Sequence, residues 1–397
     1  MDAAFLWNEE GERLTGKSEV EDPLEPGRHQ CARVEMCSNH SRDRGSTMNN
    51  TTYGLDLAKK VFQVHWVEPD TGEVKRGTLD RAELSAFFAR SAPGVVAMEA
   101  CGSAHYWGRV FKSLGHEVKL IAAQFVRPFV KTNKTDAADA QAIWEAAQRP
   151  EMRFVALKSV EQQAVLGLHR IRAQLVKMRT MQAHQVRGLL YEFGVVLPLG
   201  WRALLAQASP VLADERQGEV PELVRGELST QLEGLRALTR RIGELERQIG
   251  GWQKREAECE RIAEVPGVGR LTATAVVATV GDAKSFRSGR EFAAFLGLVP
   301  RQSGTGGRVK LLGISKRGDP YLRTLLIHGA RTVLTQQSRA DRTLDPWLQG
   351  LLLRRHKNVV IVALANKMAR TIWALMAHGR KFERSWAPTA MSALATN

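Results

Sequence analysis

The chain has 397 residues, enough for about two to four domains of ordinary size. Its 57 Lys and Arg residues outnumber its 42 Asp and Glu residues, which gives a net charge of +15. This surplus excludes an acidic buffer protein and favours a polyanionic partner. We expect no membrane partner, because no apolar run approaches the ~20 residues of a membrane helix. The four scattered cysteines form neither a disulfide framework nor a CxxC pair, so we expect a reduced cytoplasmic protein.

The first 47 residues differ in composition from the rest of the chain. They contain six Lys and Arg and ten Asp and Glu residues, so the remainder carries a net charge of +19. They also show no sustained helical or strand periodicity. We expect residues 1–47 to be a disordered extension or an upstream read-through, with Met48 as the true start, rather than an ordered domain.

Residues 48–157 alternate between strand and helix signals. Strands are predicted at 52–58, 61–67, 72–79, 95–100 and 116–122, and helices at 81–90, 103–114 and 136–147. The order βββαβαβα predicts an α/β or α+β domain with a mixed sheet.

Residues 158–258 carry two heptad patterns. The first is Leu168, Ile171, Leu175 and Met178, and the second is Leu235, Leu238, Ile242, Leu245, Ile249 and Trp252. Between them lies a connector interrupted by Pro198, Gly200, Pro210, Gly218 and Pro221. The pattern predicts two long helices that return on each other and can pair between subunits as a dimerising coiled coil. The alternative is a single amphipathic hairpin that covers a core.

Residues 259–385 are predicted to be mainly helical and basic, followed by a tail at 386–397. The segment VPGVG at 265–269 precedes an apolar helix and resembles the turn of a helix-hairpin-helix. Gly267 and Gly269 would let backbone amides approach a phosphate without reading sequence. The alternative is an ordinary Gly-rich helix start. A Gly-rich basic loop is predicted over 301–313.

Four carboxylates occupy positions where chemistry is expected. Asp56 lies within an apolar strand, where an unpaired charge is costly, and Glu99 ends another apolar strand. Asp136 and Asp139 are spaced i,i+3 and share a helix face. Together these acids would repel one another unless Mg²⁺ or Mn²⁺ bound between them. The alternatives are helix capping by Asp136 and a surface acid at Glu99.

The segments around these acids resemble a known family. GLDLAKKVFQVH contains Asp56, MEACGSAHYW contains Glu99, and KTDAADA at 134–140 contains the last two acids. They are similar to the DEDD-type transposases of the insertion sequence 110 family, in particular its 1111 subgroup. The resemblance covers nearly everything after Met48. It implies an RNase H-like (RuvC-like) α/β N-terminal domain, a C-terminal transposase domain, and a metal-binding tetrad of Asp56, Glu99, Asp136 and Asp139.

A second segment, FLGLVPRQSGTGGRVKLLGISKRGDPYLRTLLIHGAR, resembles the same family. There a serine in a short Ser-Gly loop is taken as the nucleophile that becomes joined to DNA. Ser303 preserves the residue type of that position, whereas Thr305 preserves its spacing, and we expect Ser303 to be the nucleophile. The basic residues expected to hold nucleic acid are Arg301, Arg308, Lys310, Lys316, Arg317 and Arg323. A basic surface interleaved with Trp347 and Trp373 is expected to continue from them.

These features favour a transposase that cleaves and rejoins donor and target DNA through a phosphoserine intermediate. The resemblance implies that a guide non-coding RNA selects both DNAs, and a homo-oligomer (dimer or tetramer) would assemble the site. We expect the protein in the bacterial cytoplasm, associated with the nucleoid. The alternatives are a junction-resolving nuclease in which the carboxylates activate water, and a non-catalytic nucleic-acid scaffold.

Overall fold

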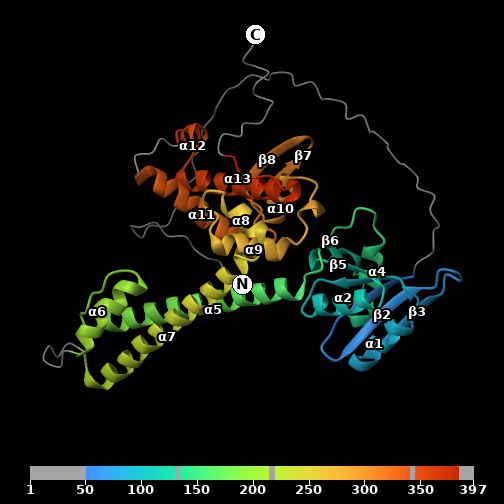
Figure 1. The fold of residues 1–397 in the computed structure, drawn as a ribbon, viewed down its shortest axis with the longest axis horizontal. Helices are drawn as coiled ribbons and strands as arrows, with labels where there is room; N and C mark the ends of the chain where they lie inside the picture. The colour runs from blue at the N-terminus through green and yellow to red at the C-terminus, as the bar shows by residue number, and fades with distance from the viewer. Residues whose placement is uncertain (1–50, 131–134, 214–219, 340–344, 384–397) are drawn as a thin grey trace, which may run out of the picture. The chain divides into compact units, whose positions relative to one another are not determined.

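The computed structural model (Figure 1) describes residues 51–130, 135–213, 220–339 and 345–383. The predictions for residues 1–47 and for the tail at 386–397 fall outside these residues, as does Lys134 of the KTDAADA motif.

A six-stranded mixed sheet occupies the N-terminal part, in the order β3-β2-β1-β4-β5-β6. Strands β1, β4 and β5 are parallel, whereas β2, β3 and β6 run antiparallel to their neighbours. The strands are β1 (Thr52–Asp56), β2 (Val61–Val67), β3 (Val74–Asp80), β4 (Val95–Glu99), β5 (Glu117–Ile121) and β6 (Phe154–Val155). The predicted mixed α/β sheet is confirmed and is consistent with an RNase H-like fold. The two-residue β6 was not predicted.

Helices cover both faces of this sheet. They are α1 (Arg81–Arg90), α2 (Ala104–Ser113), α3 (Ala123–Val126), the 3-10 helix η1 (Arg127–Phe129) and α4 (Asp136–Ala147). Neighbouring residues of β4 belong to different core clusters: Val96 packs with Phe88 of α1 and Phe111 of α2, whereas Ala97 packs with Ile143 of α4. Because side chains alternate along a strand, α1 and α2 lie on one face and α4 on the other.

Two long helices follow, α5 (Val160–Glu192) and α7 (Glu222–Gln253), as predicted. They pack antiparallel within one chain, since Arg172 pairs with Glu246 and the Gln182 amide donates to the Gln231 carbonyl. The connector differs from the prediction because it contains the helix α6 (Trp201–Ala213), with Pro210 inside it. The apolar side of α6 seals the end of the hairpin against Leu190 and Leu228, and this packing outweighs the proline.

The apolar residues of the predicted heptad pattern are buried on α7, whereas on α5 two of them are exposed. On α7, Leu235 and Ile249 are fully buried, whereas on α5 Ile171 and Met178 are 47% and 45% exposed. The buried face of α5 instead includes Val165, His169, Ala183, Val186 and Leu190. Helix α5 therefore carries two apolar stripes, and the heptad spacing identified the one that faces outward.

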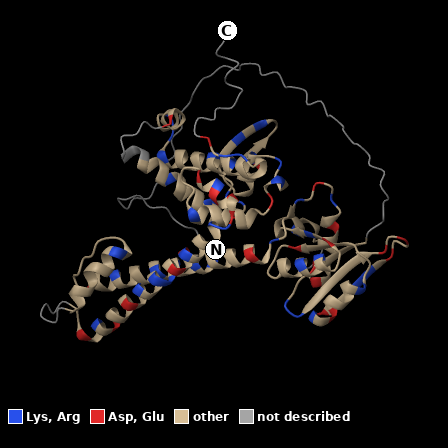
Figure 2. Cartoon of the chain, in the orientation of Figure 1, with Lys and Arg blue, Asp and Glu red and all other residues tan. Residues whose placement is uncertain are grey.

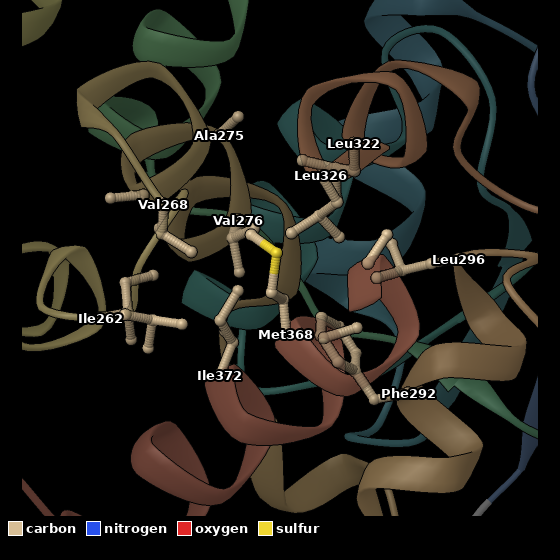
Figure 3. Packing of buried hydrophobic residues seen from close by; sticks show 14 of the residues in the cluster. Ile262, Val268, Ala275, Val276, Phe292, Leu296, Leu322, Leu326, Met368 and Ile372 are labelled. Carbon is tan, nitrogen blue, oxygen red and sulfur yellow. The ribbon is translucent and has the colours of Figure 1, made fainter. Parts of the chain in front are cut away.

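The C-terminal part is mainly helical, as predicted. It contains α8 (Ala257–Ala263), α9 (Arg270–Val280), the 3-10 helix η2 (Ala283–Ser285), α10 (Gly289–Phe295), α11 (Pro320–Arg339), α12 (Pro346–Leu352) and α13 (Lys357–His378). Figure 3 shows Met368 and Ile372 of α13 beside Val276 of α9, with Phe292 of α10 and Leu326 of α11 close by. Helix α13 thus lies at the centre of this core.

The basic loop predicted over 301–313 is a β-hairpin, so that prediction is wrong. Strands β7 (Pro300–Thr305) and β8 (Arg308–Ile314) pair antiparallel, with Thr305 opposite Arg308. Gly306 and Gly307 between them both have positive φ, 57° and 79°. Two consecutive residues with positive φ fit the turn of a two-residue β-hairpin. The glycine content of this segment indicates a turn here, but not that paired strands flank it.

Helix α13 is long and apolar enough, by length and composition, to cross a membrane, so the expectation that no such segment exists was too strict. Half of its most apolar stretch is buried in the protein, and the core helix of a globular protein passes the same test. Its packing against α9, α10 and α11 accounts for its apolar composition.

Candidate active site

Strands β1 and β4 place Asp56 and Glu99 side by side. The two strands are parallel, and Leu55 is in register with Met98, so the next residues along are the two acids. Each acid ends its strand and is only half-buried, whereas the residues before them are fully buried. The two acids therefore end neighbouring strands, as predicted, and their convergence on one metal stays a prediction.

Helix α4 brings two further carboxylates. Thr135 caps the helix, its hydroxyl accepting from the Ala138 amide at 3.3 Å, so Asp136 is not the capping residue. Asp136 and Asp139 lie in the first turn and share one face. The positive end of the helix dipole lies at this turn and partly offsets their charge.

A glycine allows α4 to approach β1 closely. A methyl group at Gly54 would come within 2.6 Å of the Trp144 Cβ atom and 2.7 Å of its backbone nitrogen. No larger residue fits at this position without moving the helix. Gly54 is two residues before Asp56, so its small size sets how near α4 comes to the end of β1.

Three of the four predicted acids form a compact group. One carboxylate oxygen each from Asp56, Asp136 and Asp139 lie within 4.8 Å of one another. Glu99 is not in that group, although its charge acts on Asp56. The pKa of Asp56 is raised to about 6, by burial first and then by repulsion from Asp139, Asp136 and Glu99. The four acids therefore share one electrostatic site.

The donors of this group suit a hard divalent cation. Carboxylate oxygens are the ligands that Mg²⁺ and Mn²⁺ prefer. Burial and the repulsion between the acids both raise the pKa of Asp56, and a bound cation would offset both effects. The acidic group therefore fits a divalent metal.

Cys101 is a neighbour that sequence reasoning did not single out. Its thiol lies close enough to the group for Glu99 and Asp56 to raise its pKa, after the larger effect of burial. The thiol is therefore kept protonated, unlike an activated nucleophile.

Ser303 lies on the exposed hairpin of β7 and β8. The hairpin register places Ser303 opposite Lys310 and Thr305 opposite Arg308, so each hydroxyl has a basic cross-strand neighbour. A pocket of about 300 Å³ is lined by Gln302, Ser303, Gly304, Gly307, Arg308 and Val309. Residues 300–314 contain no carboxylate, so a metal near Ser303 would need ligands from outside the hairpin.

The predicted basic residues have different surroundings. Arg301, Arg308 and Lys310 are exposed on the hairpin, where Lys and Arg colour both strands in Figure 2. Lys316 has a positive φ of 53°, and Arg317 is exposed beside it. Arg323 is committed to the fold, since its guanidinium donates to the Leu296 carbonyl at 2.9 Å.

The two glycines of the VPGVG turn also differ. Gly267 packs against α11, because a methyl group there would come within 2.7 Å of the Gly329 carbonyl oxygen. Gly269 is exposed and occupies the N-terminal capping position of α9. No side chain caps the first backbone amides of that helix. Of the two, Gly269 is the one placed to present amides to a phosphate.

A large open cleft of about 3120 Å³ lies in the C-terminal part. Its lining includes Lys367 and Arg370 of α13 together with Trp347 and Trp373. Lys367 sits 4.5 Å from the centre of the Trp347 ring, and the Trp373 indole donates to the Ala283 carbonyl at 3.0 Å. Trp347 is therefore the more available of the two rings.

Comparison with known proteins gives consistent matches along the chain. A DEDD transposase model (DEDD_Tnp_IS110) matches residues 53–194, and a model described as Transposase IS116/IS110/IS902 family matches residues 259–344. A Pseudomonas aeruginosa protein named "Probable family 20 transposase" is 53% identical over 83% of this chain and 97% of its own length. The Coxiella burnetii transposase for insertion sequence element IS1111A is 41% identical over 90% of this chain and 97% of its own length. The Yersinia enterocolitica transposase for IS1328 is also 41% identical, over 85% of this chain and 99% of its own length.

Proposed function

Because the chain belongs to the IS110 family of insertion-sequence transposases, we propose that Asp56, Glu99, Asp136 and Asp139 bind its catalytic Mg²⁺ or Mn²⁺. A transposase cleaves and rejoins DNA, and the DEDD group implies a divalent metal. The observation that carries this proposal is the meeting of Asp56 from β1 with Asp136 and Asp139 from α4, some 80 residues further along the chain. Bound there, a divalent cation would polarise a phosphodiester and stabilise the leaving oxygen.

Each acid has a distinct part in this proposal. Asp56 and Asp139 are half-buried and hold the inner side of the metal site, whereas Asp136 is exposed and closes it from the solvent side. Glu99, beside Asp56 at the end of β4, joins the group from the neighbouring strand. Metal binding would displace the proton that Asp56 retains near pH 6, so affinity rises with pH over that range.

Ser303 is proposed as the nucleophile. Its hydroxyl oxygen would bond to phosphorus as the bond to a deoxyribose oxygen breaks, which gives a phosphoserine ester and a free strand end. A strand hydroxyl then reverses the step, so strands exchange without a high-energy cofactor. Lys310 across the hairpin and the neighbouring Arg308 would hold the phosphate oxygens. Thr305, opposite Arg308, is the alternative nucleophile because it keeps the family spacing.

DNA is the partner of the basic surfaces. The hairpin residues Arg301, Arg308 and Lys310 present charge to the backbone, and Gly269 opens the amides at the start of α9. The cleft lined by Lys367 and Arg370 extends this surface. These contacts carry no sequence information, which suits a protein whose donor and target are selected by a guide non-coding RNA, as the family resemblance implies.

Oligomerisation would bring a serine and a metal site together from different subunits. The outward stripe of α5, with Ile171, Met178 and Met181 exposed, has the heptad spacing of a helix-pairing surface. We propose that it pairs between copies in a dimer or tetramer, acting on DNA in the bacterial cytoplasm and nucleoid.

The test is DNA cleavage by purified full-length protein on insertion-sequence end DNA, with the co-purified RNA retained. Asp56→Asn is expected to lose at least about 100-fold in cleavage, the scale of damage that changes near metal sites cause. Asp70→Asn, a change at an exposed acid between β2 and β3, is the matched control. Full cleavage by Asp56→Asn would refute the metal site, and a wild type that binds this DNA without cleaving it would support a non-catalytic scaffold.

The nucleophile is tested by trapping the covalent adduct. Ser303→Ala should abolish the protein–DNA adduct, whereas Thr305→Ala should retain it. The reverse result would assign Thr305. Metal-dependent cleavage without any adduct in the wild type would instead support the water-using, junction-resolving nuclease.

A further inference from the structure

The junction between α2 and α5 holds an unusual contact between His105 and Lys158. His105 lies in the first turn of α2, which begins five residues after Glu99. Its Nδ1 atom lies 3.3 Å from the backbone nitrogen of Lys158, and its Nε2 atom lies 3.2 Å from the Nζ atom of the same residue. One lysine therefore contacts both ring nitrogens.

The donors and acceptors in this contact restrict the protonation state of the Lys158 side chain. The Lys158 backbone N–H can only donate, so Nδ1 accepts and the proton of a neutral ring is on Nε2. That Nε2–H then points at the Lys158 nitrogen, which can accept it only as a neutral amine because an ammonium has no lone pair. The opposite tautomer would set two N–H groups against each other at Nδ1. The hydrogen bonds are all satisfied when Lys158 is uncharged.

The surrounding charges favour the same state. Burial and then Arg170 lower the pKa of Lys158, whereas Asp319 raises it. The pKa of His105 is lowered to about 4, by burial first and with contributions from Arg109 and Arg170, so its ring is neutral. Asp319 is itself engaged, since its carboxylate accepts from the amides of Tyr321 and Leu322 at the start of α11. Burial and Arg170 therefore disfavour a charge on Lys158, and the carboxylate that favours it is already engaged elsewhere.

The nearest arginine is held by neutral groups. Arg109 donates to the Lys158 carbonyl at 2.8 Å and to the Gln163 side-chain carbonyl at 2.6 Å. The pKa of the exposed Glu161 carboxylate is lowered mainly by hydrogen bonds to its own backbone and to Ser159, and Arg109 adds only a smaller effect. The guanidinium is thus fixed in place while its charge stays largely uncompensated. Arg170 is exposed on α5, and its charge acts on both Lys158 and His105.

We propose that Lys158, with Arg109 and Arg170, is a binding site for a phosphodiester of DNA, and that Lys158 is a neutral amine in the free protein which takes up a proton from solvent when the phosphate binds. This inference rests on the proposed function, because DNA cleaved at the acidic group would pass near the start of α2, which follows Glu99 by five residues. An entering phosphate supplies the negative charge that the cluster lacks. The His105 ring then keeps its contact with the Lys158 amide and releases the Nζ atom to the phosphate.

The decisive experiment counts protons during DNA binding. A short DNA duplex is titrated into the full-length protein by calorimetry at pH 8, in two buffers with different ionisation enthalpies. The wild type should take up about one proton more than Lys158→Arg, which keeps its charge at all working pH values. Lys158→Met should lose both this proton and several-fold in affinity. Lys112→Met, a change at an exposed lysine of α2, should behave as the wild type.

A second measurement needs no variant. NMR of protein labelled at its lysine side chains should show one amine uncharged at pH 8 that becomes an ammonium on addition of the duplex. An ammonium in the free protein, or equal proton uptake by the wild type and Lys158→Arg, would overturn the inference. The failure of the proposed function is distinguishable, because it is read from cleavage by Asp56→Asn and not from proton uptake.

Discussion

Gly54 on β1 lies against Trp144 on α4, so closely that a methyl group at position 54 would come within 2.6 Å of the Trp144 Cβ atom. This contact sets the separation of the two elements that carry the acidic group. Asp56 follows Gly54 by two residues, and Asp136 and Asp139 lie at the start of the same helix. The geometry of the acidic group therefore depends on a residue that has no side chain.

Gly54→Ala should separate α4 from β1. We expect it to lower the free energy of unfolding by about 1–3 kcal/mol, as overpacking does, and to reduce metal-dependent DNA cleavage at least ten-fold. Urea unfolding and a cleavage assay measure the two effects. Gly77→Ala is the control, because a methyl group there has no neighbour nearer than 3.8 Å. Unchanged cleavage by Gly54→Ala would show that this close approach does not position the acids.

Asp56 makes the stability of the metal-free protein depend on pH. Its pKa rises from 3.8 to about 6 on folding, so between these values the folded state binds more protons than the unfolded state. Its contribution to stability therefore falls as the pH rises from about 4 to about 6 and stays low at neutral pH.

Asp56→Asn should consequently raise the melting temperature of the metal-free protein by a few degrees at pH 7.5. Addition of Mg²⁺ should raise the melting temperature of the wild type much more than that of the variant. Thermal unfolding in chelator and in Mg²⁺ measures both. An equal response of the two proteins to Mg²⁺ would be incompatible with Asp56 as a ligand.

His169 joins α5 to the C-terminal core. Its Nδ1 accepts from the Tyr321 hydroxyl at 2.9 Å, and its Nε2 donates to the Thr274 hydroxyl oxygen at 3.0 Å, because that hydroxyl itself donates to the Arg270 carbonyl. The side chain is 1% exposed. Burial, aided by Arg172, lowers the pKa of His169 from 6.5 to about 4.

The folded state thus requires neutral His169, and its contribution to stability is complete above pH 6.5 and is lost as the pH falls toward 4. His169→Gln should cost about 1–3 kcal/mol at pH 7.5 through its unpaired buried partners. The difference from the wild type should shrink at pH 5. Urea unfolding at both pH values measures this, and a difference independent of pH would exclude the histidine as its source.

The outward stripe of α5 should control assembly. Replacing both Ile171 and Met178 with Gln removes apolar surface that is already exposed, so the monomer should keep its stability while the oligomer dissociates. Light scattering after size exclusion reports the mass, and Lys177→Gln is the control at an exposed position on the same helix. An unchanged mass would assign the oligomer interface to another surface.

Much of the N-terminal part could be predicted from local pattern. The strand containing Asp56 and the helix beginning at Asp136 follow from apolar runs and helix signals, and the convergence of their acids follows from charge that is costly to leave unpaired. The sequence does not distinguish Asp136 as a site residue from Asp136 as a helix cap, because aspartate is among the residues that cap helices. Only the coordinates assigned the cap to Thr135.

The sequence by itself determined strands β1 to β5 of the sheet, the two long helices, and Asp56, Asp136 and Asp139 as candidate site residues, because these depend on periodicity and on residue type. The tertiary structure decided which stripe of α5 is buried, since both stripes have helical spacing and only the packing of α7 and the C-terminal core chooses between them. It also decided that Gly54 admits α4 and that Lys158 meets both nitrogens of His105. Those contacts join residues that are 53 or more positions apart in the sequence. No local sequence pattern determines whether such distant residues pack against each other.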